Sequence, residues 1–143
     1  MGLPGVVSRW LNRLFPPRSL GQRGESAAAR YLKRRGYQIV AQGDRSRWGE
    51  IDLIAVDKKR TIVFVEVKTR QSADAGHPSE AVDDGKQGRL TRLAVTYLKR
   101  HGLLEYTARF DVIAVTWPPG QRRPQIEHVL NAFDVVGKGG LYS

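Results

Sequence analysis

The sequence EIDLIAVDKKRTIVFVEVKT, which spans residues 50–69, contains two apolar runs separated by the charged segment 57–60. The runs, residues 50–56 and 61–69, consist mainly of residues that favour strands. The short connection between them predicts that the two strands pair as an antiparallel hairpin. Helical and strand-like segments lie before and after this hairpin in the sequence, so the order of elements predicts an α/β layer domain with a mixed sheet.

Charged side chains interrupt both predicted strands. Asp52 lies in the first strand, and Glu66 and Lys68 lie in the second. Burying an unpaired charge costs several kcal/mol, so these groups need partners or a function. Strand residues two apart share a face, and Glu66 and Lys68 therefore point the same way. Val63, Val65 and Val67 point the other way, into a core.

The face on which Asp52 lies depends on how the two strands pair. A register with an even residue sum, with 52 opposite 66 and 56 opposite 62, places Asp52 on the face of Glu66. An odd register, with 56 opposite 61, turns Asp52 to the other face. The turn residues do not decide between the two. We expect the even register, which leaves residues 57–61 as the connection.

An Asp and a Glu that converge on one face supply the oxygen ligands that Mg²⁺ prefers. The bound ion lowers the pKa of a water molecule and stabilises charge that develops at a phosphate, and a nearby Lys adds to both effects. Asp52, Glu66 and Lys68 are therefore the minimum set for metal-assisted phosphodiester hydrolysis. The alternative is an ordinary Glu–Lys pair on a solvent-facing strand.

Two further acids lie near this set in the sequence. Glu25 falls in one helical stripe with Ala28, Ala29 and Leu32, so we expect it to face inward as a third acid. Its alternative role is to complement the helix dipole in a first turn. Glu50 shares the face of Asp52, but it can equally mark the start of the strand.

The composition indicates a phosphate-rich partner and excludes several kinds of site. The net charge is +10, with 24 Lys and Arg against 14 Asp and Glu, and most of the excess falls in residues 1–47. Such an excess attracts nucleic acids by releasing counterions, although a basic protein without such a partner is the alternative. Cys is absent, which excludes disulfides and thiolate catalysis and fits a cytoplasmic protein. The three His are too scattered for a His-rich metal site.

The chain divides into three regions. Residues 1–20 are expected to form a basic amphipathic N-terminal extension, residues 21–136 the folded α/β domain, and residues 137–143 a flexible tail. The extension carries apolar residues at helical spacing, so residues 1–16 could dock on a membrane or a protein, or form a loosely held tail. No apolar stretch reaches the roughly 20 residues needed to span a bilayer. Other expected elements are a helix at 22–35, a strand at 37–42, a polar turn at 43–48, a loop at 71–79, a helix from the N-cap Asp83 to Gly102, a strand at 109–116 and a short edge strand at 125–130.

Several motifs, in this order along the chain, resemble those of the bacterial YraN family. They are Gly24-Glu25-x-x-Ala28, Gly36-Tyr37, Gly49-Glu-Ile-Asp-Leu-Ile-Ala55, Val63-Phe-Val-Glu-Val-Lys-Thr-Arg70, Gly76-x-Pro78-x-Glu80, Arg109-Phe-Asp-Val-Ile-Ala-Val115 and Asn131-Ala-Phe133. The family is similar to the restriction-endonuclease-like superfamily, with its PD-(D/E)xK motif, and to archaeal Holliday-junction resolvases. The resemblance therefore implies a mixed central sheet flanked by helices in the order α-β-β-β-α-β-β.

The resemblance also implies site residues and a cofactor. Asp52 and Glu66 match the acids of the motif and would bind Mg²⁺ or Mn²⁺, with the Val67 carbonyl as a further ligand. Lys68 matches the motif Lys, which would polarise the nucleophile or the scissile phosphate. Glu25 matches the helix-borne acid of the resolvase-like branch and would assist directly or through water.

The resulting hypothesis is a magnesium-dependent endonuclease that acts on DNA, including branched DNA, with DNA favoured over RNA. Its alternative is a noncatalytic nucleic-acid-binding protein that keeps the nuclease fold. Related resolvases act as dimers, so a homodimer is a further expectation. The basic residues next to the site are expected to contact phosphates, with a solvated surface charge as the alternative for each. They are Arg45, Arg47 and Arg70, and, on the second helix, Lys86, Arg89 and Arg92.

Overall fold

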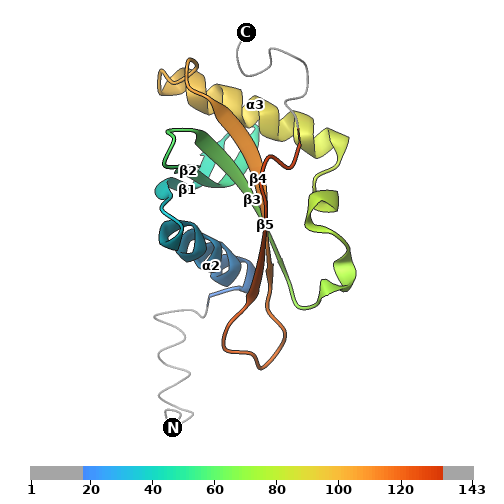
Figure 1. Ribbon diagram of the computed structural model, residues 1–143. Coiled ribbons are helices and arrows are strands. Elements are labelled where there is room, and N and C mark those ends of the chain that lie inside the picture. The colour runs from blue at the N-terminus through green and yellow to red at the C-terminus, as the bar shows by residue number, and fades with distance from the viewer. Residues whose placement is uncertain (1–17, 134–143) are drawn as a thin grey trace, which may run out of the picture.

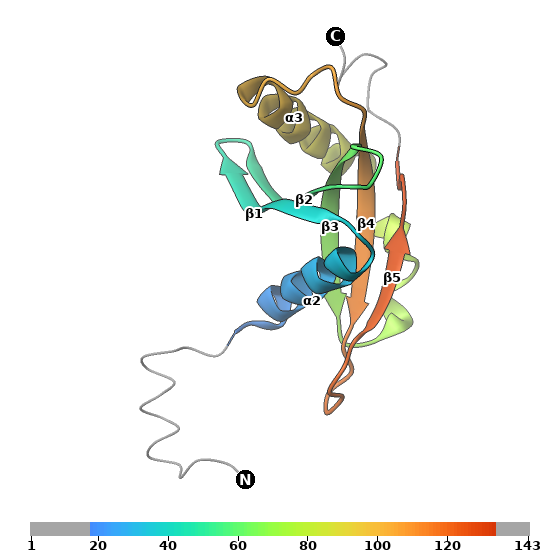
Figure 2. The ribbon, with the colours of Figure 1, turned by 60° about the vertical axis from the view of Figure 1, so that its left-hand side comes forward.

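Residues 18–133, which the computed structural model describes, form a five-stranded sheet with one long helix on each face (Figures 1 and 2). The elements are α2 (Leu20–Arg34), β1 (Gln38–Ser46), β2 (Gly49–Val56), β3 (Ile62–Arg70), α3 (Asp84–Arg100), β4 (Ala108–Thr116) and β5 (Gln125–Val129). This order confirms the predicted α-β-β-β-α-β-β arrangement. Residues 1–17 of the predicted N-terminal extension and the predicted C-terminal tail lie outside the described residues, and Leu20 belongs to α2 instead of the extension.

The sheet is mixed, as predicted. Its strands follow the sequence order from β1 to β5, and all neighbours are antiparallel except β3 and β4. A parallel pair needs a long crossover connection, and α3 supplies it. β5 pairs only with β4 and so forms one edge of the sheet, as expected for the short strand near residue 125.

The pairing of β2 with β3 has the expected even register. Leu53 pairs with Val65 and Val56 pairs with Ile62, which places Asp52 opposite Glu66. Asp57 donates its backbone N–H to the Thr61 carbonyl at 3.1 Å, so residues 57–61 close the connection. A slip of one residue would turn Asp52 to the face opposite Glu66.

Each face of the sheet has its own hydrophobic core. The face under α2 buries Val63 and Val65 of β3 against Ala28 and Leu32 of the helix. The face under α3 buries other residues of the same strands against the helix stripe, namely Ile54, Ile62, Phe64, Phe110, Leu90, Leu93, Tyr97 and Leu98. The strands β2, β3 and β4 therefore contribute apolar residues to both faces of the sheet.

Local capping explains where the two helices begin. The Ser19 hydroxyl accepts the Gln22 backbone N–H at 3.1 Å, and the Gln22 side chain accepts the Ser19 N–H at 2.9 Å. This capping box starts α2 two residues before the predicted position. The N-cap of α3 is Asp83, as predicted, and its carboxylate accepts the Lys86 N–H at 2.8 Å. No helix in the described part of the chain is long and apolar enough to cross a membrane.

The prediction for the segment after the first strand was wrong. Residues 43–46 belong to β1 rather than to a polar turn, and the turn is reduced to Arg47 and Trp48. Pairing with β2 outweighs the weak strand propensity of these polar residues. The predicted loop at 71–79 overlaps two short 3-10 turns, Ala73–Ala75 and Pro78–Ala81.

The hairpin formed by β1 and β2 bends away from the rest of the sheet (Figure 2). Gly43 has a φ of 66°, which favours glycine, and the register places it opposite Asp52. Beyond this point the tip packs toward α3, where Arg100 donates to Asp44 at 3.2 Å. Ile51 accordingly joins the core under α3, whereas Leu53 joins the core under α2. The bend therefore falls at Asp52.

The close packing of α2 on β3 leads to a prediction about Gly24. A Cβ atom at this position would lie 1.9 Å from the Thr69 hydroxyl, so Gly24→Ala should destabilise the fold by about 1–3 kcal/mol. Gly88 in α3 is a matched control because a Cβ there meets nothing within 4 Å. Gly88→Ala should instead stabilise by about 0.5–1 kcal/mol. Urea unfolding of both variants measures the two changes in the free energy of unfolding. Equal changes would contradict the close packing of Gly24 against Thr69.

Candidate functional site

The site begins where β2 separates from β3. Their pairing extends to Leu53 and Val65, and just beyond it the Val67 N–H donates to Asp52 Oδ2 at 2.9 Å. The N–H and C=O groups of a paired strand residue point toward the same neighbouring strand. The Val67 carbonyl therefore faces the same gap as the Asp52 carboxylate. A side-chain and a main-chain oxygen thus come together from two strands.

Glu66 lies beside this gap, opposite Asp52 in the register. Its side chain is 15% exposed, and its Oε1 contacts the Lys86 ammonium from the first turns of α3. Lys86, expected as a phosphate contact, is therefore held against one of the candidate metal-binding acids. This ion pair compensates part of the negative charge at the site.

The four acids of the region act on one another electrostatically. Burial and the charge of Glu66 raise the pKa of Asp52 to about 7, and Glu25 and Glu50 add to the effect. The Val67 N–H partly offsets it by stabilising the carboxylate. Burial, followed by Glu50 and Glu66, also raises the pKa of Glu25. The structure thus brings together four carboxyl groups from α2, β2 and β3, of which Glu66 pairs with Lys86 and Glu50 pairs with Arg45.

The oxygen atoms of this cluster suit a hard divalent cation. Among residues 18–133, no group of three or more His, Cys, Asp or Glu side chains has the spacing to hold a metal ion. Mg²⁺, however, keeps several waters and binds proteins through one or two carboxylates. Asp52, Glu66 and the Val67 carbonyl meet that requirement. A bound cation would favour the ionised form of Asp52 and so oppose the burial and the Glu66 charge that raise its pKa.

The remaining residue of the expected catalytic set is Lys68. It lies two residues after Glu66 on β3, so strand alternation places both on the same face. Its side chain is exposed, in contrast to Lys86. The site therefore has one lysine held on an acid and a second one accessible from solvent.

Most of the expected phosphate contacts lie on the bent hairpin and on α3. Arg45 donates to Glu50 at 2.9 Å, and the guanidinium groups of Arg47 and Arg92 lie 4.7 and 5.0 Å from the Trp48 ring. Arg89 is exposed beside Gly49 at the same tip. These side chains form a basic rim around an exposed tryptophan, next to the acids.

Arg70 has a different environment. Its Nε donates to the Thr116 hydroxyl at 3.0 Å, and its Nη1 donates to the Gly76 carbonyl at 2.6 Å. The guanidinium therefore ties the end of β3 to β4 and to the following loop. A contact with phosphate would have to use the Nη2 group or the second N–H of Nη1.

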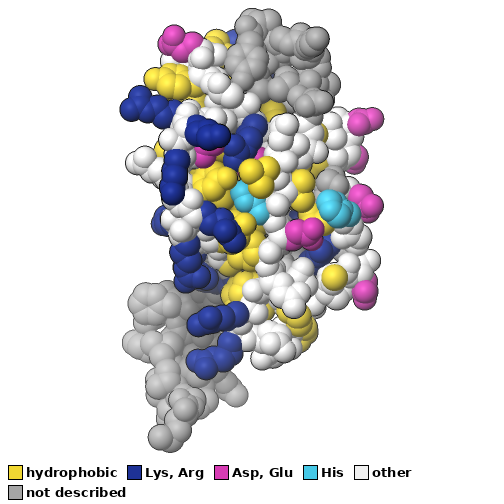
Figure 3. Space-filling model, in the orientation of Figure 1, with side chains coloured by type: hydrophobic (Ala, Val, Ile, Leu, Met, Phe, Trp, Pro, Cys, Tyr) yellow, Lys and Arg dark blue, Asp and Glu magenta, His cyan; other side chains and the backbone are white. Residues whose placement is uncertain are grey.

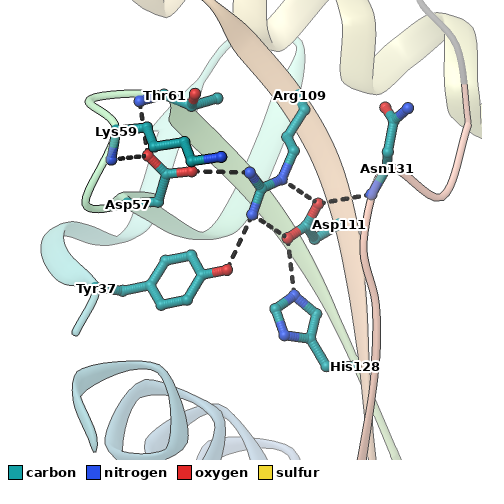
Figure 4. Close-up of polar contacts among 8 residues, drawn as sticks. All are labelled: Tyr37, Asp57, Lys59, Thr61, Arg109, Asp111, His128 and Asn131. Atoms are coloured by element: carbon teal, nitrogen blue, oxygen red, sulfur yellow. Dashed lines mark hydrogen bonds and ion pairs between the residues drawn. The ribbon is translucent and has the colours of Figure 1, made fainter. Parts of the chain in front are cut away.

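A second polar cluster lies on the α2 side of the sheet and was missed by the sequence analysis (Figure 4). The Arg109 guanidinium lies between two carboxylates, donating to Asp57 at 2.9 Å and to Asp111 at 3.0 Å. It also donates to the Tyr37 hydroxyl at 2.9 Å. His128 Nε2 lies 2.7 Å from the other oxygen of Asp111, whose side chain is fully buried. The cluster links β1, β4, β5 and the turn after β2.

The hydrogen bonds of this cluster determine its charge state. Burial alone would raise the pKa of Asp111, but hydrogen bonds from His128, Arg109 and the Asn131 backbone outweigh it and lower the pKa. The pKa of Asp57 is lowered in the same way, mainly by the Thr61 N–H and Arg109. Both acids therefore stay ionised. The alternation Arg109-x-Asp111 within an apolar strand is the signal that could have revealed them, since it is the same kind of interruption as Glu66.

These observations define a class of protein, a mixed α/β domain that gathers carboxylates where two central strands separate. A family model described as "Uncharacterised protein family UPF0102" matches residues 24–115. The chain belongs to this family, which confirms the resemblance to YraN proteins. The chain is 52% identical to UPF0102 protein RB9115 of Rhodopirellula baltica, covering 86% of this chain and 75% of that protein. It is 50% identical to a UPF0102 protein of Geobacter metallireducens, with 83% and 95% coverage.

Two solved structures share part of the fold. One is a repair endonuclease from Pyrococcus abyssi, with 20% identity and a TM-score of 0.41, covering 67% of this chain. This chain corresponds to only 39% of that endonuclease. The other is SfsA of Pyrococcus furiosus in complex with Ca²⁺, with 13% identity and a TM-score of 0.33, covering 76% of this chain and 61% of SfsA.

Proposed function

We propose that this protein is a magnesium-dependent endonuclease that hydrolyses phosphodiester bonds in DNA, including branched DNA. The observation that carries the proposal is the Asp52 carboxylate, held by the Val67 N–H at 2.9 Å and surrounded by Glu66, Glu25 and Glu50. Burial, followed by the charge of Glu66, raises the pKa of Asp52 to about 7, and such a shift beside further acids is typical of a functional site. The basic composition of the chain supplies the attraction for a phosphate polymer.

The residues have separate roles in this proposal. Asp52, Glu66 and the Val67 carbonyl hold the cation, which supplies an activated water and stabilises charge on the phosphate. Lys68, exposed on the face of Glu66, orients the nucleophile or contacts the scissile phosphate. Glu25 accepts a proton directly or through water, for which its raised pKa is suited. The basic rim around Trp48 contacts the flanking phosphates.

One observation favours a second candidate function, a noncatalytic nucleic-acid-binding protein. The Lys86 ammonium already neutralises part of the charge on Glu66, as an internal counterion would. A site compensated in this way could keep its fold without a divalent ion. Binding of DNA that depends on salt, with no metal uptake and no cleavage, would establish this alternative.

A nicking assay tests the proposed activity. Supercoiled plasmid and four-way-junction DNA are incubated with the full chain and Mg²⁺ or Mn²⁺. We expect cleavage by the wild type and a loss of roughly 10²-fold or more in Asp52→Asn and Lys68→Ala. Lys58→Ala is the control, because this exposed lysine lies in the β2–β3 turn away from the acids. Equal cleavage by all four preparations would indicate a contaminating nuclease and contradict the proposal.

The ion pair between Lys86 and Glu66 gives a prediction about metal affinity. Because the ammonium competes with a cation for the same carboxylate, Lys86→Met should tighten Mn²⁺ binding by about fivefold. Lys99→Met, at the exposed far end of α3, removes the same charge without touching the acids and should leave the affinity unchanged. Isothermal titration with Mn²⁺ measures both variants. Weaker binding in Lys86→Met would mean that Lys86 supports the metal site instead of competing with it.

A further inference from the structure

The strongest unassigned feature of the surface is a groove between α2 and the β4–β5 connection, which we call the arginine groove. It encloses about 520 Å³, and its charged lining consists of Arg30, Arg34, Arg35, Arg122 and Arg123. All five are exposed, and no acidic residue lines the groove. Its floor is formed mainly by apolar and aromatic residues, including Tyr31 and Trp117. In Figure 3, Lys and Arg side chains follow the side of the molecule that carries α2, whereas Asp and Glu lie mainly along the opposite edge.

The charge of this groove is not compensated within the protein. Among residues 18–133, none of the five arginines forms an ion pair, although several other arginines do. Arg30 and Arg34 are four residues apart on α2, a spacing at which like charges destabilise a helix. The arrangement therefore costs stability in the isolated chain, and an anionic ligand would remove that cost.

The extent of the basic surface indicates a polymer and not a small anion. A second hollow, lined by Arg18 and Arg23, shares Arg30 and Trp117 with the arginine groove. Arg23, Arg30 and Arg34 lie on one stripe of α2 that extends about 16 Å. A single phosphate group is too small to span this length, whereas a nucleic-acid backbone presents successive phosphates along it.

The aromatic residues of the groove favour a duplex over a single strand. The Arg23 guanidinium lies 4.1 Å from the centre of the Trp117 ring, and Arg35 lies 4.3 Å from that of Tyr31. Single-strand binders leave such rings open so that bases can stack on them. Here the rings instead support guanidinium groups, which orients their remaining N–H groups toward phosphate oxygens.

The arginine groove is separate from the candidate catalytic site. On α2, which has about 3.6 residues per turn, Glu25 lies on roughly the opposite side of the helix from Arg23, Arg30 and Arg34. The sequence analysis assigned phosphate contacts only to residues near β2, β3 and α3, and none of them lines this groove. A duplex bound here would contact the flank of α2 that faces away from the acids.

We propose that the arginine groove binds the phosphate backbone of a nucleic-acid duplex, as a second contact surface distinct from the catalytic site. This inference rests on the proposed function in one respect, namely that the ligand is a nucleic acid. Contacts with phosphates carry no sequence information, so the groove would position a duplex without selecting its sequence. Duplex DNA and duplex RNA present the same phosphate chemistry, and the test distinguishes them.

Fluorescence anisotropy with labelled DNA and RNA duplexes over a range of KCl concentrations tests this proposal on the full chain without divalent metal. The variants are Arg30→Gln/Arg34→Gln and Arg122→Gln/Arg123→Gln. Each pair should weaken binding of the preferred duplex by about tenfold or more and reduce the slope of log Kd against log salt by about 1.8. Thermal unfolding should be nearly unchanged, because exposed arginines without partners contribute little to stability.

Lys58→Gln/Lys59→Gln is the matched control, since it removes two exposed charges from the β2–β3 turn. Its affinity and salt slope should stay within about twofold of the wild type. A loss equal to that of the groove variants would show a general charge effect and overturn the proposal. Unchanged duplex binding in the groove variants would overturn the proposal as well. The same holds if these variants lose binding to anionic lipid vesicles, measured in parallel, but keep their duplex binding.

The same experiment separates this proposal from the proposed nuclease activity. If the wild type cleaves no DNA but the groove variants lose duplex binding, the groove assignment stands and the catalytic one fails. If the groove variants bind as the wild type does while Asp52→Asn alone abolishes cleavage, the reverse holds. Asp52→Asn should itself retain duplex binding through the groove.

Discussion

Replacing Asp111 with alanine is expected to lower the free energy of unfolding by about 3–5 kcal/mol. The Asp111 side chain is fully buried and accepts hydrogen bonds from Arg109 at 3.0 Å and from the Asn131 backbone at 2.9 Å. His128 Nε2 lies 2.7 Å from its second oxygen. The substitution leaves the buried His128 ring and the Asn131 N–H without their acceptor, removes one of the two carboxylates that hold Arg109, and opens a cavity between β4 and β5. Chemical denaturation measures the loss.

The control for this prediction is an exposed ion pair. Arg100 and Asp44 lie 3.2 Å apart with their side chains 47% and 23% exposed, so Asp44→Ala should cost less than about 1 kcal/mol. The pKa of Asp111 is lowered in the folded protein, so its contribution is present above its ordinary pKa and lost as the pH falls through the folded pKa. The difference in the free energy of unfolding between wild type and Asp111→Ala should therefore become smaller in acid. A small difference in the free energy of unfolding at neutral pH would show that the Arg109 cluster does not stabilise the fold.

The substitution Asp52→Asn should have the opposite effect on stability. The folded pKa of Asp52 is about 7, well above its ordinary value, so the folded state binds more protons than the unfolded state between these two values. Stability is therefore lost as the pH rises through this range, and the loss is complete above it. Removing the charge should stabilise the metal-free protein by about 2 kcal/mol at about pH 8, allowing for solvent screening. The amide oxygen can still accept the Val67 N–H.

The pH dependence makes this prediction specific. Near pH 4, where Asp52 is protonated in the folded state, wild type and Asp52→Asn should unfold at nearly the same temperature. Saturating Mn²⁺ at higher pH should stabilise the wild type and not the variant, because a ligand that binds only the folded state raises its stability. Thermal unfolding with and without Mn²⁺ checks both statements. A variant that is less stable than the wild type at pH 8 would contradict the electrostatic repulsion at the site.

The sequence predicted those features that depend on local patterns in the chain. The apolar runs of β2 and β3 predict the hairpin, and the expectation that Asp52 and Glu66 share a face predicts its even register. Asp52 and Glu66 were found because each breaks an apolar strand. The polar segment at 43–46 was wrongly predicted as a turn. Its pairing with β2 depends on the bend at Gly43, and strand propensity alone does not indicate this pairing.

Features that depend on tertiary contacts could not be predicted in this way. The contact between Lys86 and Glu66 requires the position of α3 relative to β3, which the 13 residues between the two elements leave undetermined before folding. The arginine groove combines α2 with a connection almost 90 residues later in the sequence. The Arg109 cluster is a partial exception. Its two strand residues gave the same signal as Glu66, whereas His128 and Tyr37 acquire their roles only when β1, β4 and β5 assemble.

The central claim is that Asp52 and Glu66 hold a divalent cation in the gap between β2 and β3. The most direct measurement is anomalous scattering from crystals of the full chain soaked in Mn²⁺. We expect a peak within coordination distance of both carboxylates and the Val67 carbonyl oxygen, and no such peak in Asp52→Asn. Wild-type crystals with no manganese in this gap, or with the ion bound only at other acids of the chain, would contradict the claim.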